Sequence, residues 1–405
     1  MIVFFLKIST YNIIKSDHCH TAFMIYKFLL LHILCLLLNC KSEPKKQLRE
    51  ISEGTNLNVK YAKGFSIKDY KTYKILEINK PWPQSKKNYR FALLKANYDA
   101  NFWSLEKQRF DDVIELPINK IVVTSTTHIP ALDLLNVEQT LIGFPGTDFI
   151  SSEKIRQQIN QGSIRELGKN DGLNTEVLLE LNPDLVVGFG IDGNNRSLET
   201  IKKSGIPVIF NGDWVENSPL AKAEWIKFFG ALYNKEKEAD SIFNQIEKNY
   251  LEAKLLAQNA KTKPTVLSGA MHNDIWYLPN GTSTEAQLLK DANVNYLWQD
   301  TVGSGSLKLN FESVFVKAKD ADIWLNPSNY SSFETLKNGN ENHALFKAFQ
   351  NKNMFTFTNT IGESGGVLYY ELGMTRPDLV LKDLIKICHP GLLENYEAHF
   401  FKPLK

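Results

Sequence analysis

A stretch of helical character separates two segments in which short apolar runs alternate with amphipathic runs, and this order constrains the fold most. The helical stretch covers 219–260 and contains neither proline nor glycine between Gly230 and its end. Within it, Ala239, Phe243 and Ile246 recur at the spacing of one helix face. The alternating segments are typical of parallel α/β sheets. The sequence therefore predicts two α/β lobes joined by one long helix.

The first alternating segment is expected to form an N-terminal lobe at 118–234. Its predicted strands lie at 120–123, 140–143, 185–188 and 208–211, and its predicted helices at 129–135, 152–161, 175–181 and 197–204. Gly205 and Pro207 follow the last of these helices, where helices commonly end. We expect the interlobe helix at 235–260.

The second alternating segment is expected to form a C-terminal lobe at 261–405. It follows Lys263 and Pro264, which end the helical stretch. Its predicted strands lie at 265–269, 323–326 and 354–357, and its predicted helices at 283–292, 310–317, 343–350 and 376–388. The fold class is therefore α/β, with two similar lobes.

The first forty residues are predicted to be a signal peptide. The apolar run at 28–38 is shorter than the ~20 residues that a membrane-spanning helix needs. It ends in Leu-Leu-Asn-Cys, which resembles a bacterial lipobox, so Cys40 is the predicted lipidation site. Met24 begins a complete short signal of its own, and residues 1–23 would then not be translated. We expect a lipid-anchored protein of the cell envelope, in the periplasm.

The residues that follow Cys40 are predicted to be a tether and a small extension. The 41–58 segment is rich in charged and polar residues, as a flexible tether requires. The 59–117 segment contains short apolar runs, at 74–78 and 89–94, that are separated by Pro81-Trp82-Pro83. We therefore expect a β-rich N-terminal extension that packs on the first lobe.

Charge and motifs argue against nucleic acid binding and against catalysis. The chain has 47 basic and 45 acidic residues, a formal charge of +2, so it has no basic excess to neutralise phosphates. The sequence shows no Ser-His-Asp order, paired carboxylate motif or Walker lysine. We predict a protein that is not an enzyme, needs no cofactor and has no nucleic acid partner.

Five segments resemble the metal-chelate class of periplasmic binding proteins, whose members bind ferric siderophores, haem or cobalamin for ABC importers. The segments are IVVTSTTHIPALDLLN at 121–136, NTEVLLELNPDLVVGFG at 174–190, SGIPVIF at 204–210, LNFESVFVKAKDADIWLNP at 309–327 and RPDLVLKDLIKICHPGLL at 376–393. The resemblance implies two Rossmann-like lobes on a helical backbone, which close on an iron or cobalt chelate with limited motion. It also implies delivery to an ABC permease in the inner membrane, and we expect a monomer.

The same resemblance implies two permease-docking residues. In that family a glutamate on the outer rim of each lobe docks into arginine pockets of the permease, and the matching positions are Glu176 and Glu312. A carboxylate at a helix N-terminus is favoured by the helix dipole, and when exposed it can pair with arginine through both oxygens. The alternative is that both glutamates only stabilise their helices.

The ligand is expected to contact loops at the C-terminal ends of the strands. A bulky, partly apolar chelate requires aromatic faces and a few polar groups. The predicted ligand-binding residues are Thr127, His128, Phe149, Phe189 and Trp214 in the first lobe, and Trp276, Tyr277, Trp298, Tyr330, Tyr369, Tyr370 and Arg376 in the second. Ordinary core packing is the alternative for each aromatic residue.

Three alternative functions stay open at this point. The 188–193 loop reads Gly-Phe-Gly-Ile-Asp-Gly after a strand, with Asp213 about 20 residues further on, which is typical of dinucleotide binding by a Rossmann-type enzyme. Against this, the next helix is expected to start only after 194–195, too far from the loop to receive a pyrophosphate. His128 and His272 offer one ligand in each lobe for a bare metal ion. The third alternative is a scavenger of chelates that works without a permease.

Overall fold

The computed structural model describes residues 54–190, 192, 195–303 and 305–405. The predicted signal peptide, the predicted lipidation site Cys40 and the tether up to residue 53 lie outside the described residues. Among the described residues, no helix combines the length and the apolar character that crossing a membrane requires.

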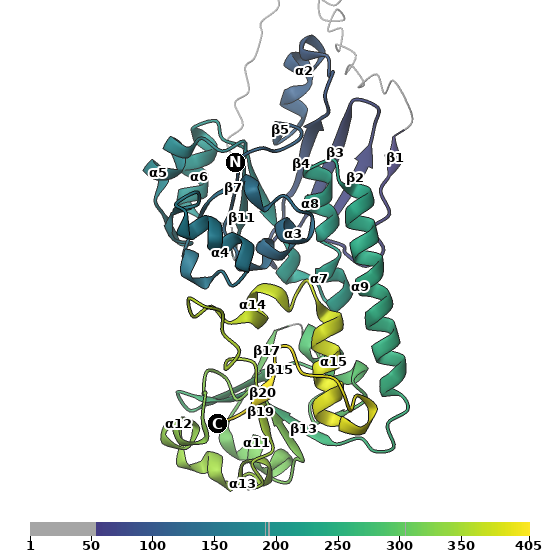
Figure 1. Cartoon of the computed structure of the whole chain (residues 1–405), viewed down its shortest axis with the longest axis vertical. Helices are drawn as coiled ribbons and strands as arrows, with labels where there is room; N and C mark the ends of the chain where they lie inside the picture. The colour runs from purple at the N-terminus through teal and green to yellow at the C-terminus, as the bar shows by residue number, and fades with distance from the viewer. Residues whose placement is uncertain (1–53, 191, 193–194, 304) are drawn as a thin grey trace, which may run out of the picture. The chain divides into compact units, whose positions relative to one another are not determined.

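The N-terminal extension, predicted at 59–117, is built on one five-stranded sheet whose first strand lies at 55–56, within the predicted tether (Figure 1). Its strands are β1 (Thr55–Asn56), β2 (Phe65–Asp69), β3 (Tyr73–Asn79), β4 (Asn88–Leu94) and β5 (Asp112–Glu115), in that spatial order, and α2 (Ala100–Glu106) and the short η1 (Lys107–Arg109) lie between β4 and β5. Neighbouring strands are antiparallel except for the parallel β4–β5 pair. Phe65, Ile67 and Leu76 pack in the same apolar cluster as Phe228 of the first lobe. The extension thus shares a core with that lobe.

The first lobe contains a five-stranded parallel sheet in the order β12-β11-β6-β7-β8. The strands are β6 (Ile121–Val123), β7 (Leu141–Phe144), β8 (Arg165–Glu166), β11 (Leu185–Phe189) and β12 (Val208–Asn211), with a small β9 (Gly168–Lys169) and β10 (Gly172–Leu173) hairpin. The helices are α3 (Ile129–Leu134), α4 (Glu153–Asn160), α5 (Thr175–Leu181) and α6 (Arg196–Lys203). The elements predicted for this lobe are present at the expected positions.

The second lobe contains a sheet in the order β16-β13-β18-β19-β20, in which only β20 is antiparallel. The strands are β13 (Thr265–Ser268), β16 (Asn295–Tyr296), β18 (Ile323–Leu325), β19 (Met354–Thr356) and β20 (Lys402–Pro403). The helices are α10 (Thr284–Asp291), α11 (Phe311–Ala318), α12 (Phe333–Gly339), α13 (Lys347–Gln350), α14 (Leu368–Leu372) and α15 (Pro377–Cys388). An antiparallel sheet of β14 (Ala270–His272), β15 (Ile275–Pro279) and β17 (Ser306–Leu309) adds to this lobe.

Two predicted helices are interrupted in the structure. The 219–260 stretch forms three helices: α7 (Pro219–Ala223), α8 (Ile226–Leu232) and α9 (Glu236–Ala257). Asn234, with a φ of 55°, separates α8 from α9 because a left-handed residue cannot continue a right-handed helix. The 343–350 helix is instead the 3₁₀ turn η6 (Glu341–Leu345) followed by α13, with the extended residue Phe346 between them.

Helix α9 connects the two lobes (Figure 1). It has 22 residues, which corresponds to about 33 Å at 1.5 Å per residue. Buried side chains from its first half, such as Phe243, pack in the core of the first lobe, and those from its second half, such as Tyr250, pack in the core of the second. The Tyr250 hydroxyl also donates to Asp291 of α10 at 2.6 Å. One rigid element is therefore part of both cores, and the predicted fold class is confirmed.

The two lobes repeat one device that joins the starts of two neighbouring parallel strands. Asp184, before β11, accepts hydrogen bonds from the backbone N–H of Asn119 (2.8 Å) and Lys120 (2.9 Å) before β6. Asp322, before β18, accepts from the backbone N–H (3.0 Å) and hydroxyl (2.8 Å) of Thr265 at the start of β13. Each aspartate thus fixes the start of the adjacent parallel strand, because it satisfies backbone donors that the sheet leaves unpaired.

A buried carboxylate links the lobes directly. Glu371 of α14 is 3% exposed and accepts hydrogen bonds from the backbone N–H of Ser151 and, at 2.9 Å, of Ser152. Ser152 is the N-cap residue of α4, so a side chain from the second lobe caps a helix of the first. Burial raises the pKa of Glu371 from 4.5 to about 7, and the two N–H donors oppose this rise.

We predict that this contact is pH-dependent. The folded state binds the proton more tightly than the unfolded state, so the contribution of Glu371 to stability is complete below pH 4.5 and is lost as the pH rises through 7. Between these limits the free energy of unfolding of the wild type should fall by about 3 kcal/mol relative to Glu371→Gln, as measured by denaturant unfolding.

Glu363, in the segment that precedes α14, is exposed and provides the control. Glu363→Gln should keep the pH dependence of the wild type, whereas Glu371→Gln should lose the part that is due to Glu371, because an amide does not titrate. Identical pH slopes for the wild type and Glu371→Gln would contradict the assignment.

Candidate ligand-binding cleft

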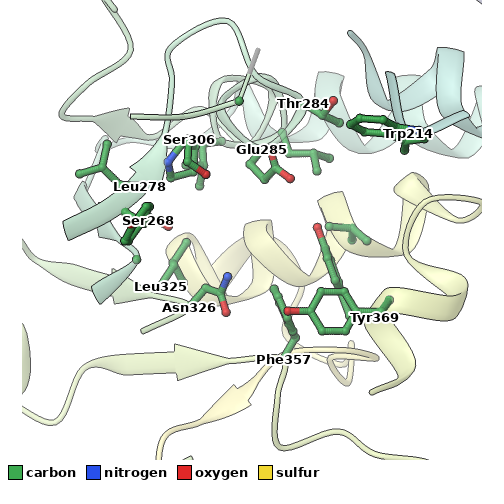
Figure 2. Close-up of a pocket in the computed structure, with 18 of the residues that line it drawn as sticks. Trp214, Ser268, Leu278, Thr284, Glu285, Ser306, Leu325, Asn326, Phe357 and Tyr369 are labelled. Carbon is green, nitrogen blue, oxygen red and sulfur yellow. The ribbon is translucent and has the colours of Figure 1, made fainter. Parts of the chain in front are cut away.

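A cleft of about 540 Å³ lies between the lobes, mostly on the side of the second lobe (Figure 2). This volume is typical of small-molecule sites, which range over about 300–1,000 Å³. The second lobe contributes Tyr277, Thr284, Glu285, Asn326, Phe357, Tyr369, Tyr370 and Phe401 among others, the first lobe contributes Trp214, Val215, Glu216, Asn217 and Lys222, and the extension contributes Pro83. Three parts of the chain thus surround one cavity.

The first-lobe side of the cleft is the 214–217 segment, which follows β12. Asp213, just before it, is 5% exposed and accepts a hydrogen bond from the Thr127 hydroxyl at 2.9 Å. Its own backbone N–H donates to the Asn211 side chain at 2.8 Å. Burial raises the pKa of Asp213, and the hydrogen bond from Thr127 opposes that rise. These bonds position Trp214, whose ring lies 5.8 Å from that of Phe189.

Aromatic rings form the second-lobe side of the cleft. Phe357, which follows β19, stacks on Tyr369 of α14 with ring centroids 4.0 Å apart and planes 6° apart (Figure 2). Tyr370 meets the edge of Phe357 at 5.4 Å and Phe401 meets it at 5.5 Å. Stacked and edge-on rings present broad apolar faces to the cavity, which suits a planar or bulky ligand.

Two residues that line the cleft each carry a polar atom that is unpaired within the described part of the chain. The indole N–H of Trp214 and the side-chain oxygen of Asn326 are buried and have no hydrogen-bond partner among the described residues. Buried polar atoms are normally paired, so an unpaired donor and an unpaired acceptor are suited to a polar guest. Asn326 adopts a φ of 51°, which turns the chain at the end of β18.

Charged side chains of both signs line the cleft. Glu216 is largely occupied, because it accepts hydrogen bonds from the backbone N–H of Lys63 (2.9 Å) and Gly64 (2.8 Å). Burial raises the pKa of Glu216, and these donors oppose the rise. Glu285, in the first turn of α10, is exposed, and Lys222 donates to the Trp214 carbonyl at 3.3 Å.

The arrangement suits recognition by contact and hydrogen bonding. Among the described residues, no group of three or more His, Cys, Asp or Glu side chains is placed to hold a metal ion. His128 is fully buried, and neither of its ring nitrogens has a partner among the described residues, while His272 is exposed on β14. A ligand in this cleft would meet aromatic faces, amides, hydroxyls and the charged groups of Glu285 and Lys222.

Four of the predicted ligand-binding residues line the cleft: Trp214, Tyr277, Tyr369 and Tyr370. Two others lie behind its first-lobe side, because Thr127 bonds to Asp213 and Phe189 packs against Trp214. The structure therefore brings only some of the predicted residues to the cavity, and these come from both lobes.

The other predicted ligand-binding residues lie away from this cavity. Trp276 is fully buried and stacks on Trp324, Trp298 is 4% exposed, and His128 is in the first core next to Phe229. Phe149 is 64% exposed, and Tyr330 packs so tightly on Gly339 that a Cβ there would lie 2.2 Å from its hydroxyl. Arg376 pairs with Asp378 through two hydrogen bonds of 2.8 Å at the start of α15.

Several cleft residues were not predicted. Phe357, Glu285 and Asn326 each follow a strand or begin a helix of the second lobe, so the rule used for the predicted residues could have found them. Pro83 carried no such signal, because it belongs to the extension.

Glu176 and Glu312 occupy matching positions in the two lobes. Both are exposed, and each is the second residue of its helix, α5 and α11. Each helix is capped by an asparagine: Asn174 accepts from the N–H of Val177 at 3.2 Å, and Asn310 from that of Ser313 at 2.9 Å. The two carboxylates are therefore presented to solvent by equivalent local structures.

The glycine-rich loop has a packing explanation in its described part. A Cβ on Gly188 would lie 2.8 Å from Leu198 of α6, and one on Gly190 would lie 3.2 Å from Phe210. Helix α6 begins only at Arg196, beyond residues 191, 193 and 194, which lie outside the described part of the chain. These glycines allow α6 and β12 to approach β11 closely.

Comparisons with known proteins identify the family. A family model described as "Periplasmic binding protein" matches residues 121–360, more than half of the chain. An uncharacterized lipoprotein of Methanocaldococcus jannaschii is 29% identical over 93% of this chain and 96% of its own length.

Two solved structures have a similar fold. A possible iron-binding, periplasmic solute-binding protein of Staphylococcus epidermidis aligns with a TM-score of 0.54 at 17% identity, over 67% of this chain and 99% of its own. A periplasmic heme-binding protein of Pseudomonas aeruginosa aligns with a TM-score of 0.53 at 16% identity, over 71% of this chain and 98% of its own. At such low identity these structures support the fold alone, whereas the family model covers most of both lobes. The chain therefore belongs to the periplasmic binding protein family.

Proposed function

We propose that this protein captures a metal-chelate nutrient, a ferric siderophore, haem or cobalamin, and delivers it to an ABC permease. The main support is the cleft itself, in which the stacked rings of Phe357 and Tyr369 and the unpaired N–H of Trp214 surround one cavity. The descriptions of the S. epidermidis protein as a possible iron-binding protein and of the P. aeruginosa protein as heme-binding agree with this ligand class.

The proposal includes attachment to a membrane in the cell envelope through lipid on Cys40. The relative from M. jannaschii is described as a lipoprotein, which agrees with the Leu-Leu-Asn-Cys sequence at 37–40. A lipid anchor would keep the protein close to its permease, so the effective concentration of the two partners would be high.

Closure of the cleft would be stabilised by contacts that the bound ligand makes with both lobes. A ligand that touches both Trp214 and Tyr369 stabilises the closed arrangement, because those contacts form only when the lobes are together. Release would follow when a permease binds Glu176 on one lobe and Glu312 on the other and separates the lobes. The protein carries out no covalent chemistry in this scheme.

Direct titration tests the ligand class. Purified protein is titrated with haemin, a ferric tris-catecholate and cyanocobalamin, with visible absorption and tryptophan fluorescence as readouts. At least one chelate should bind with a Kd of about 1 nM to 1 μM. Tyr370→Ala should weaken that binding by about tenfold, because the exposed Tyr370 ring would lose its contact with the ligand.

Tyr98→Ala is the matched control, since Tyr98 lies in the extension and is not among the described residues that line the cleft. It should bind the same chelate within about twofold of the wild type. Binding of none of the three chelates, or binding of NAD instead, would contradict the proposal.

Charge reversal tests the docking residues. Glu176→Arg combined with Glu312→Arg should leave chelate affinity unchanged and lower permease-dependent uptake by about tenfold or more, because two interfacial ion pairs would become repulsive. Uptake is measured with vesicles that contain the permease.

The matched control is Glu180→Arg combined with Glu334→Arg. Both residues are exposed glutamates on helices of the two lobes, and Glu334 is also the second residue of its helix. This pair should retain uptake. Normal uptake by the Glu176 and Glu312 double variant would instead favour a scavenger that works without a permease.

A further inference from the structure

The N-terminal extension contributes to the ligand cleft. Pro83 lies in the turn that joins β3 to β4, and it lines the cavity together with Trp214 and Val215. Pro83 is itself exposed, whereas its neighbours Pro81 and Trp82 are buried. The turn therefore has an anchored part and a part that is accessible to a ligand.

The anchored part fits closely against the strand end that leads to the cleft. The ring of Trp82 is 8% exposed and meets the edge of Phe210 of β12 at 5.2 Å. A Cβ on Gly212 would lie 3.1 Å from the Cα of Pro81, so any larger residue there would crowd the turn. The 81–83 turn is thereby positioned next to Asp213 and the 214–217 segment.

Residues 60–64 are a second part of the extension that contacts this region of the first lobe. Glu216 accepts from the N–H groups of Lys63 and Gly64, as described above. Glu224, which is fully buried, accepts from the N–H groups of Lys60 (2.8 Å) and Ala62 (2.9 Å), as well as from that of Tyr61. Glu216, which lines the cleft, and the buried Glu224 thus both accept from backbone donors of one stretch, residues 60–64.

The extension lies outside the part of the chain that the family model describes, because that match begins at residue 121. The S. epidermidis structure is covered over 99% of its length by only 67% of this chain. The family model therefore does not describe the 81–83 turn, whereas the alignment with the M. jannaschii lipoprotein covers 93% of this chain.

We infer that the extension is a third wall of the cleft and that Pro83 is a specificity-determining residue, which limits the size of the chelate that can enter. This inference rests on the proposed function. A rigid proline at the rim restricts the opening without losing side-chain entropy, because its ring fixes φ and has no flexible end. A bulkier side chain at this position should obstruct large chelates more than small ones.

Pro83→Trp tests the inference, with Gln84→Trp as the matched control. Gln84 is the next residue, is exposed, and is not among the described residues that line the cleft. Both variants and Pro83→Ala are titrated with the chelates that bind the wild type. Pro83→Trp should weaken the largest of these by about tenfold or more and change the ratio of affinities between large and small chelates. Pro83→Ala should relax the discrimination, and Gln84→Trp should stay within about twofold of the wild type.

Thermal unfolding of each variant separates binding from folding. Equal melting temperatures for Pro83→Trp and Gln84→Trp, with altered affinity only in the former, would support the third wall. Equal affinities in the two tryptophan variants would overturn the inference while the proposed function stands. If the wild type binds none of the chelates, the proposed function fails and the inference falls with it.

Discussion

The apolar face of α9 is the constraint on which the rest of the structure depends. Its Phe243 end is buried in one core and its Tyr250 end in another, so the helix cannot leave either lobe without exposing large side chains. Truncation of a buried aromatic residue typically costs about 3–5 kcal/mol. A connection of this kind favours a small adjustment between the lobes over a wide hinge motion, and it keeps Trp214 and Tyr369 on opposite sides of one cavity.

Two further sets of contacts join the parts of the chain that surround the cleft. Glu371 caps α4 across the lobes, and it belongs to the same short helix as Tyr369, so ligand contact and interlobe contact share one element. Glu216 and Glu224 fix the extension to the segment that carries Trp214. The cleft is therefore supported by three parts of the chain, and a change in any of them would alter its shape.

The alternation of strands and helices could be read from the sequence because local signals mark it. Strand β11 is the apolar run Leu-Val-Val-Gly-Phe that begins directly after Asp184, and α5 begins after the capping Asn174. The break at Asn234 and the sheet of β14, β15 and β17 were missed, since a left-handed residue and short strands leave weak patterns in the sequence.

Whether a strand residue belongs to the site depends on which side of the strand it faces. Trp276 and its neighbour Tyr277 face opposite sides of β15, and only Tyr277 of the two reaches the cleft. Pro83 meets the cleft through a tertiary contact that no local pattern indicates.

Two lobes on one rigid helix are proposed to bind a single ligand from both sides. Hydrogen exchange measured by mass spectrometry, with and without a chelate that binds, tests this proposal most directly. Binding should slow exchange in both the 214–217 segment and α14, while α9 stays protected along its whole length in either state. Slowing confined to one lobe, or an α9 that exchanges as two independent halves, would contradict the account.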